Sequence, residues 1–387
     1  MNRWISAGQA LEALGVKPQT LYANVSRGRI RAKADPRDAR RSLYNGEDVG
    51  RLRAQRAGRR PAEVVAVQAI HWGEPVLPSA ITAVMHGRLW YRGVDAIRLS
   101  DSASFEAVCA LLWETAEADA MKASAAPVRV DASASPLQAA LTLLAARAAC
   151  DAPSLGRSPS ELVADAGTLV DGIASALLGE PARRRKACAM HTRIAAAWKA
   201  PHAADAIRKS LVLLADHELN PSTFAARVAV STGAPLSAAL LAGLATLAGP
   251  LHAGAWSELR ALMEFARGVG PAAAVHTALA QRQRLPAFGH PLYAHGDPRA
   301  RALLASFDVG PTHADLAREV ESATGELPNI DFALGAMADA SDLPPHAPLV
   351  IFAIARSAGW VAHALEQVRS GEPIRPRARY TGAMPVA

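Results

Sequence analysis

Cysteine is scarce in this chain of 387 residues, and its spacing excludes several classes of protein. Cys109, Cys150 and Cys188 are odd in number, far apart and without a CxxC pair, which argues against a disulfide framework or a structural zinc site. No run of about 18 uncharged apolar residues is present, so we expect no membrane span. The first residues also lack the apolar core and cleavage site of a secretory signal. These absences predict a cytoplasmic protein.

Acidic residues are scarce at the start of the chain, where positive charge accumulates. Residues 1–60 contain 14 Lys and Arg against five Asp and Glu, a balance of +9, whereas the rest of the chain contains 28 against 30. Half of all residues are hydrophobic and a fifth are charged, which is typical of globular proteins with a large core. The pattern indicates a small basic head attached to a nearly neutral body.

Capping and turn residues predict that the head is a compact domain. It is expected over residues 1–57, with a linker over residues 58–63. The expected elements are a helix capped by Ser6 and ending at Leu14, a turn at Gly15, a second helix over residues 19–27, two wing strands over residues 29–33 and 40–44, and a last helix over residues 46–56.

Five short blocks carry a family resemblance for the head. They are Leu14-Gly15-Val16, Thr20-Leu21-Tyr22, Val25-Ser26-Arg27-Gly28, Arg41 to Tyr44 and Asp48-Val49. With these blocks the head resembles the winged helix-turn-helix of MerR-like and excisionase-type proteins, which implies DNA binding. The alternative is a solvated basic face that only aids solubility. In the DNA-binding hypothesis three residues face a groove, namely Tyr22, Asn24 and Arg27, and five cations neutralise phosphates, namely Arg29, Arg31, Lys33, Arg40 and Arg41.

The body is rich in alanine and its pattern is helical. Pro and Gly separate the helices, and β-branched alternating runs are scarce, so residues 64–387 are predicted to form an all-α domain, with a strand-like exception over residues 64–92. The fold class expected for the whole chain is therefore mainly α. Helices are expected over residues 137–150, 159–178, 204–219, 235–248, 256–268, 311–323 and 346–369.

Histidine and arginine cluster in the Gly- and Pro-rich joints between these helices. His252 lies just before a predicted helix start, where exposed amides favour a neutral imidazole. Asp331, two residues after Asn329 in an apolar setting, can have a raised pKa and act as a base. Taken singly, a His in such a turn is more often structural, and an Asp after Asn is most often part of a helix cap. The four joints are residues 216–224, 249–255, 288–299 and 328–332.

Together and in this order, the joints belong to a longer series of matching blocks. The further blocks are Gly87 to Gly93, Phe105-Glu106 with Leu111 to Trp113, Ala355 to Trp360 with Ala362-His363, and Ile374 to Ala378. With this series, residues 64–387 resemble citrate synthase. The resemblance implies a homodimer with a large and a small domain, which close over oxaloacetate and admit acetyl-CoA. The small domain is expected over roughly residues 254–342.

The resemblance also implies a role for each residue at a matching position. Asp331 would take a proton from the acetyl methyl group, because a thioester α-proton is a poor acid and needs a base. His252 would donate a hydrogen bond to the developing enolate oxygen, and His290 would polarise the oxaloacetate carbonyl. The substrate carboxylates would be bound by His217, Arg299 and Arg356, and by Arg375 from the partner subunit.

The predicted coenzyme A site departs from the family's pattern. Ala287, Phe288 and Gly289 match the loop whose backbone lies against the adenine, but Ala287 replaces a glycine. The stretch from Tyr293 to Gly296 lacks the basic residue that many relatives have there, so phosphate recognition is expected to differ. Acetyl-CoA is the implied cosubstrate, with no other cofactor and no metal ion.

The resemblance leaves several activities open. The leading hypothesis is condensation of acetyl-CoA, or a close acyl-CoA, with oxaloacetate to give citrate and CoA. A preference for propionyl-CoA would instead make 2-methylcitrate, and cleavage of a citryl-CoA-type thioester would use the same site. The rival from another class is a DNA-binding transcriptional regulator that uses the synthase fold as a metabolite sensor.

Overall fold

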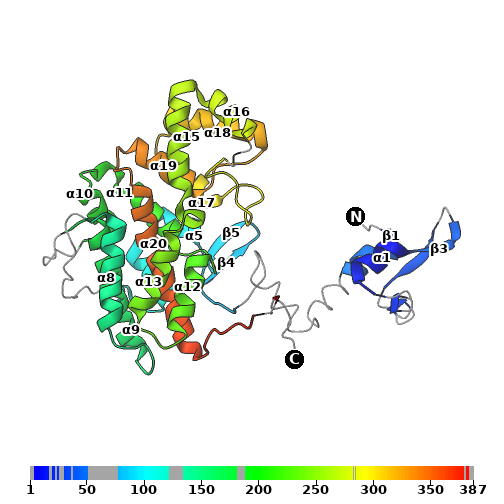
Figure 1. Cartoon of the computed structure of the whole chain (residues 1–387), viewed down its shortest axis with the longest axis horizontal. Helices are drawn as coiled ribbons and strands as arrows, with labels where there is room; N and C mark the ends of the chain where they lie inside the picture. Colours follow the sequence, from blue (N-terminus) through cyan, green and yellow to red (C-terminus); the bar gives the residue numbers. More distant parts are fainter. Residues whose placement is uncertain are drawn as a thin grey trace. The chain divides into compact units, whose positions relative to one another are not determined.

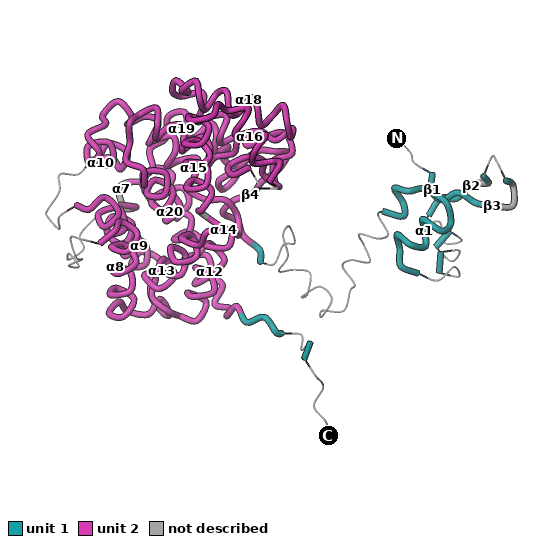
Figure 2. Tube along the Cα trace, turned by 45° about the horizontal axis from the view of Figure 1, so that its top comes forward, with its two compact units in different colours: residues 1–78, 375–387 teal, residues 79–374 magenta. Residues whose placement is uncertain are grey.

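The computed structural model divides the chain into two compact units, shown in separate colours in Figure 2. Unit 1 comprises Met1–Pro78 and Arg375–Ala387, and unit 2 comprises Ser79–Ile374. The structure describes residues 4–16, 20–21, 24–25, 30–35, 38–50, 77–121, 134–180, 188–281, 283, 285–378 and 381–382.

The head in unit 1 contains a three-stranded antiparallel sheet and helical segments. The strands β1 (Trp4–Ser6), β2 (Ala32–Asp35) and β3 (Asp38–Asn45) lie in the order β1-β3-β2. β3 contains the predicted strand over residues 40–44, whereas β2 begins at Ala32, so it shares only two residues with the strand predicted over residues 29–33. The third strand, β1, was not predicted, because three residues are too few to display a period-2 pattern.

The first predicted helix of the head is confirmed. α1 (Ala7–Leu14) begins after Ser6, whose side chain forms a capping box with Gln9, and it ends at Gly15, which adopts φ 59°. The described parts of the next predicted helices, residues 20–21, 24–25 and 46–50, are helical, whereas the linker at residues 58–63 lies outside the described residues. The winged helix-turn-helix therefore stays a prediction. A small core unites these elements: Ala10, Leu14, Leu21, Ile30, Tyr44 and Val49.

A second small sheet opens unit 2. Its antiparallel strands β4 (Thr82–Met85), β5 (Arg88–Tyr91) and β6 (Val94–Asp95) fall at the end of the predicted strand-like region and just beyond it. Tyr91 fixes this sheet to the helices, because its buried hydroxyl lies 3.1 Å from Val212 O and 3.2 Å from Asp216 O.

Helices dominate the other described residues of unit 2, which confirms the mainly α expectation, although several of them were not in the predicted set (Figure 1). The helices before His217 are α5 (Ala96–Ser102), α6 (Phe105–Trp113), α7 (Glu117–Ala120), α8 (Pro136–Cys150), α9 (Pro159–Leu177), α10 (Met190–Ala197), the 3-10 helix η1 (Pro201–Ala203) and α11 (Ala204–Leu214). Those that follow are α12 (Pro221–Val230), α13 (Leu236–Leu247), α14 (Pro250–Ala253), α15 (Ala255–Val269), α16 (Pro271–Ala280), α17 (Pro298–Leu304), α18 (Pro311–Thr324), α19 (Ile330–Ala340) and α20 (Ala347–Ser370).

The helix predicted over residues 204–219 was too long. α11 ends at Leu214, and the chain then turns through Glu218, which adopts φ 52°. Asn220 caps the next helix by accepting from the amides of Ser222 and Thr223. Residues 215–217 stay buried after the helix ends, and the polar side chains of Asp216 and His217 take partners on other elements.

α20 is the central helix of unit 2. It packs against α6, α9, α11, α12 and α13, and nearly all of its residues are buried (Figure 1). Within the described residues it is the one helix long and apolar enough to cross a membrane, and 94% of its most apolar window is buried inside the structure. Its hydropathy is thus accounted for by packing on all sides.

A separate apolar core lies between α15, α16, α18 and α19. Its buried residues run from Leu259 to Ala336, inside the range predicted for a small domain, 254–342. It includes Phe288, whose ring lies 5.1 Å from that of Phe332. The division into a large and a small domain itself stays a prediction.

The closest approach of α20 to the end of α11 occurs at Gly359. Its amide donates to Ala215 O at 3.0 Å, and a Cβ added there would lie 2.6 Å from that carbonyl oxygen and 2.9 Å from Asp216 Cβ. Only glycine fits this contact without a backbone shift.

We expect Gly359→Ala to lower the free energy of unfolding by about 3 kcal/mol, because the new methyl group meets backbone atoms that cannot rotate away. Gly268→Ala is the control, since a Cβ on that exposed helical glycine meets nothing within 4 Å and should stabilise by about 0.5–1 kcal/mol. Urea unfolding of both variants measures the difference. Equal stability of Gly359→Ala and the wild type would contradict the packing described.

Candidate active site

Three aromatic rings from two joints meet at the centre of the candidate site. The turn after α11 carries His217, and the turn before α17 carries His290 and Tyr293. His217 Nε2 lies 2.9 Å from Tyr293 Oη, and the His217 ring centroid lies 5.1 Å from that of His290. The structure therefore brings together two predicted residues that are 73 positions apart. Tyr293 was not predicted as a site residue, and its position three residues after His290 is the one signal the sequence offers.

Both histidines of this group are held in the neutral form. Burial lowers the pKa of His290 to about 4, with a further contribution from Arg299. Burial also lowers the pKa of His217 well below its usual range, assisted by Arg299 and Arg356. The Leu292 amide donates to His290 Nδ1 at 3.2 Å, so the proton of the neutral ring resides on Nε2. His290 can thus offer an N–H donor without carrying charge.

His252 lies at the junction of α14 and α15. Its Nε2 is 2.9 Å from Ser222 Oγ and 3.2 Å from Asn220 Oδ1, which leaves Nδ1 for a ligand. Burial lowers its pKa to about 4, and the charge of Arg356 adds to the effect. The predicted neutral imidazole is thus supported, but its main cause is burial rather than the helix start.

Arg299 is one of two guanidinium groups buried in this site. Asp297 holds it in a bidentate pair, with Nε to Oδ1 at 3.0 Å and Nη2 to Oδ2 at 2.8 Å. Asp297 Oδ2 also accepts the amide of Ile330 at 3.1 Å, which ties the pair to the start of α19. These bonds lower the pKa of Asp297 and keep the pair ionised despite burial.

Arg356 is the second buried guanidinium. Its Nε donates to Leu214 O at 2.9 Å, and its guanidinium lies over the Phe352 ring at 4.8 Å. Within the described residues no carboxylate lies within 4.0 Å of it, and burial lowers its pKa to about 10. An incompletely compensated buried cation attracts an anion, so this position suits a carboxylate ligand. Phe352, one helical turn before Arg356, also faces His252 at 6.5 Å and was not predicted.

Asp331 lies at the second position of α19. Its amide donates to Asn329 Oδ1, so Asn329 is the cap and the Asp331 carboxylate remains available. Burial raises its pKa to about 6, against the opposing pull of Arg299 and Arg356. A carboxylate with this pKa is ionised at neutral pH and basic enough to accept a proton.

The predicted coenzyme A loop is tied to the segment before α19. Gly289 N donates to Leu327 O at 2.9 Å, and Asn329 N donates to Ala287 O at 3.0 Å. Asn329 Nδ2 also donates to Gly289 O at 3.1 Å. Ala287 adopts φ 67°, a left-handed conformation that favours glycine. The departure at Ala287 therefore places strain in the backbone of this loop.

A chain of hydrogen bonds and ion pairs connects Asp216, His363, Arg227 and Glu366. His363 Nε2 is 3.2 Å from Asp216 Oδ2, and its Nδ1 is 3.2 Å from Arg227 Nη1. Since the arginine can only donate, His363 holds its proton on Nε2 and donates to Asp216. Arg227 pairs in turn with Glu366 at 2.6 Å. His363 thus orients the carboxylate that precedes His217.

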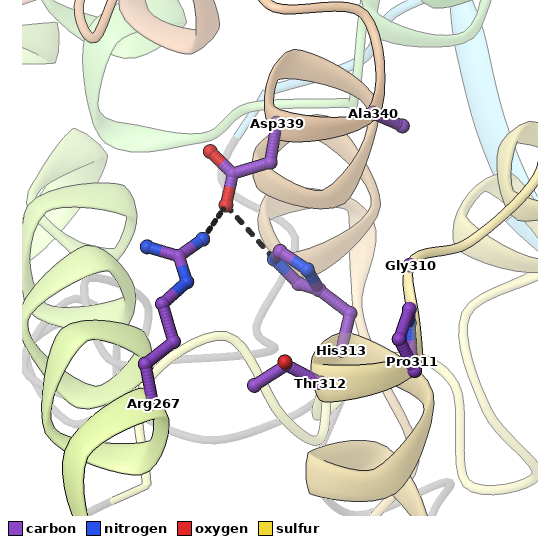
Figure 3. Close-up of a pocket in the computed structure, with 7 residues that line it drawn as sticks. All are labelled: Arg267, Gly310, Pro311, Thr312, His313, Asp339 and Ala340. Carbon is purple, nitrogen blue, oxygen red and sulfur yellow. Dashed lines mark hydrogen bonds and ion pairs between the residues drawn. The ribbon is translucent and has the colours of Figure 1, made fainter.

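Arg375 is exposed and belongs to unit 1, so its predicted role from the partner subunit stays a prediction. A cavity between α15, α18 and α19 is lined by none of the predicted site residues. In Figure 3, Asp339 lies between Arg267 and His313 in this cavity, with Arg267 Nη2 at 2.5 Å.

The head residues predicted to contact DNA have different environments. Asn24 is buried and its Nδ2 donates to Thr20 O, so it faces the head's core and is not offered to a groove, contrary to the prediction. Arg31 forms a bidentate pair with Asp48, and Lys33 is exposed with Nζ 4.5 Å from the Trp4 ring centroid. Tyr22, Arg27 and Arg29 lie outside the described residues, as do the side chains of Arg40 and Arg41, which lie in β3.

Comparison with known proteins defines the class. Residues 70–377 match the family model described as citrate synthase, C-terminal domain. This match covers most of the chain, which therefore belongs to the citrate synthase family.

The relatives are named for two different activities. Citrate synthase 2 of Bacillus subtilis is 35% identical over 193 residues, which cover 47% of this chain and 52% of the relative. Citrate synthase of Haloferax volcanii is 37% identical over 46% of this chain and 50% of its own length. A 2-methylcitrate synthase of Mycobacterium tuberculosis is 34% identical over 46% of this chain and 48% of its own length. The chain spans about half the length of these relatives.

Solved structures share the fold. Citrate synthase from Pyrobaculum aerophilum superposes with a TM-score of 0.67 at 26% identity, covering 81% of this chain and 92% of its own. Citrate synthase from Thermoplasma acidophilum, solved as a ternary complex with carboxymethyl coenzyme A and oxaloacetate, superposes with a TM-score of 0.68 at 21% identity, covering 81% and 95%. The mainly α citrate synthase fold is thus confirmed.

We expect Ala287→Gly to raise the free energy of unfolding by about 1 kcal/mol, because it relieves a left-handed alanine. Ala314→Gly, at the fourth position of α18, is the control and should destabilise by about 1 kcal/mol, since its backbone is helical. Thermal unfolding distinguishes the two. Destabilisation by both substitutions would show that Ala287 is not strained.

Proposed function

We propose that this protein condenses an acyl-CoA, with acetyl-CoA as the first candidate, with oxaloacetate to give citrate and CoA. The observation that supports this most is the pairing of a carboxylate of raised pKa, Asp331, with neutral histidines and two buried arginines in one site. Carbon acid chemistry needs a base and a neutral donor where charge develops, and a dicarboxylate needs cations.

The proposed reaction begins with proton transfer. Asp331 takes a proton from the methyl group of the thioester, and His252 donates a hydrogen bond to the enolate oxygen that forms. The hydroxyl proton of Ser222 can go to Asn220 Oδ1 at 2.7 Å or to His252 Nε2 at 2.9 Å. In the second arrangement the imidazole proton lies on Nδ1, where it serves this purpose. Because His252 is neutral, it donates a hydrogen bond to the enolate oxygen and keeps its own proton.

Bond formation follows at oxaloacetate. The CH2 carbon of the enolate attacks the oxaloacetate carbonyl carbon, and His290 Nε2–H supplies the proton to the carbonyl oxygen, which becomes a hydroxyl. The proton that Asp331 accepted returns to His290 through solvent, which restores both groups. His217, Arg299 and Arg356 bind the oxaloacetate carboxylates, joined by Arg375 of the partner subunit in a homodimer. Water then cleaves the thioester of the product to release CoA and citrate.

The direct test is CoA release from acetyl-CoA and, separately, propionyl-CoA in the presence of oxaloacetate. Faster turnover of propionyl-CoA would assign 2-methylcitrate synthesis. Cleavage of citryl-CoA, supplied without the other substrates, would favour the alternative activity on a citryl-CoA-type thioester. No turnover with any of these acyl-CoA esters would sink the proposal.

The pH dependence of kcat tests the base. Only the ionised carboxylate accepts a proton, so kcat should fall as the pH is lowered through about 6, the pKa of Asp331. His252 and His290, with pKa values of about 4, remain neutral over this range. Asp331→Asn should lower kcat at least about 100-fold. Asp308→Asn, which removes an exposed loop carboxylate, should leave both the rate and the profile unchanged.

DNA binding by the head is a second proposed function, supported by the balance of +9 over residues 1–60. The full chain should bind duplex DNA at low salt, with an affinity that falls steeply as salt rises. Reversing charge at Arg40 and Arg41 together should weaken binding about tenfold or more, and reversing it at Arg318 in α18 should not. Fluorescence anisotropy, with and without oxaloacetate, measures both. If the full chain showed no affinity for DNA even at low salt, DNA binding would be ruled out and the basic face of the head would only aid solubility.

A further inference from the structure

Two turns form one edge beside the predicted coenzyme A loop. Leu327, whose carbonyl accepts from Gly289, also packs on the turn that follows His290. A Cβ added at Gly296 would lie 2.7 Å from Leu327 Cδ1. The turn from residue 293 to residue 296 therefore lies next to the loop from residue 287 to residue 289, although it contains no lysine or arginine.

An arginine from a neighbouring helix reaches this edge. Arg301 extends from α17, and its Nη2 donates to His295 O at 3.3 Å and lies 3.7 Å from the Cβ position at Gly296. The side chain is exposed, and no carboxylate among the described residues lies within 4.0 Å of it. A guanidinium has five N–H donors, so the bond to His295 orients the group and leaves donors for a ligand.

We propose that Arg301 binds the phosphate groups of the acyl-CoA nucleotide. The inference rests on the proposed function, which places an acyl-CoA on the loop at Ala287–Gly289. Coenzyme A carries several phosphate charges, and a guanidinium recognises a phosphate with paired N–H donors. α17 also carries Arg299, which is proposed to bind a carboxylate of oxaloacetate. The same short helix would therefore contact both substrates through two arginines.

A carboxylate of the opposite charge lies at the same loop. A Cβ added at Gly289 would be 3.1 Å from Glu326 Oε1, and Glu326 is exposed. It repels a phosphate that Arg301 attracts, so the two residues should affect acyl-CoA binding in opposite directions. This opposition separates a role in charge recognition from a role in packing.

The experiment compares KM values for acetyl-CoA and for acetyl-pantetheine, which lacks the nucleotide. Arg301→Ala should raise the KM for acetyl-CoA about fivefold to tenfold, with Arg301→Lys between it and the wild type. Glu326→Gln should lower this KM about twofold. The KM for oxaloacetate and the rate with acetyl-pantetheine should stay unchanged, and the changes should shrink at high salt. Arg318→Ala, at an exposed arginine of α18, is the matched control.

Calorimetric titration of CoA itself separates failure of this inference from failure of the proposed function. Without turnover, tighter binding of CoA to the wild type than to Arg301→Ala would still support the phosphate contact. Equal binding of CoA by the two proteins, or no binding by the wild type, would overturn it. A rise in KM that is the same for acetyl-CoA and acetyl-pantetheine would also overturn it, since the lost contact would then not be with the nucleotide.

Discussion

The burial of two guanidinium groups in one site is the constraint on which the rest of the site depends. Arg299 and Arg356 are each about 2% exposed, and taking two like charges out of water costs several kcal/mol per ion unless partners offset it. Asp297 offsets the charge of Arg299. Arg356 has weaker compensation, because it contacts only the carbonyl of Leu214 and the face of the Phe352 ring among its described contacts. The site therefore retains positive charge, which depresses the pKa values of its histidines and favours a bound anion.

The fold holds this charge in place through close backbone approaches. Gly359 allows α20 to touch the end of α11, which places Arg356 beside the carbonyl of Leu214. The same contact buries Asp216, whose carboxylate contributes to keeping Arg356 charged and is oriented by His363. A substitution far from any ligand can thus alter the electrostatics of the site through packing.

Many of the helices could be predicted from the sequence, because the spacing of apolar residues within a helix is a local pattern. The ends of α8, α9 and α20 fall within a residue or two of their predicted positions. α11 ended before its predicted end, since Asp216 and His217 take partners on other elements. Tyr293 and Phe352 escaped prediction because their importance lies in which rings they face across the fold.

The sequence alone determined the fold class, the family resemblance and the titratable residues of the site, because residue type and spacing are properties of the chain itself. Tertiary structure decided the protonation of those residues. The neutral forms of His217, His252 and His290 arise from burial near Arg299 or Arg356, which come from different helices. Burial raises the pKa of Asp331 as well, although the two arginines oppose that rise. Desolvation and Coulomb interactions depend on distance in space, and the order of residues along the chain does not specify that distance.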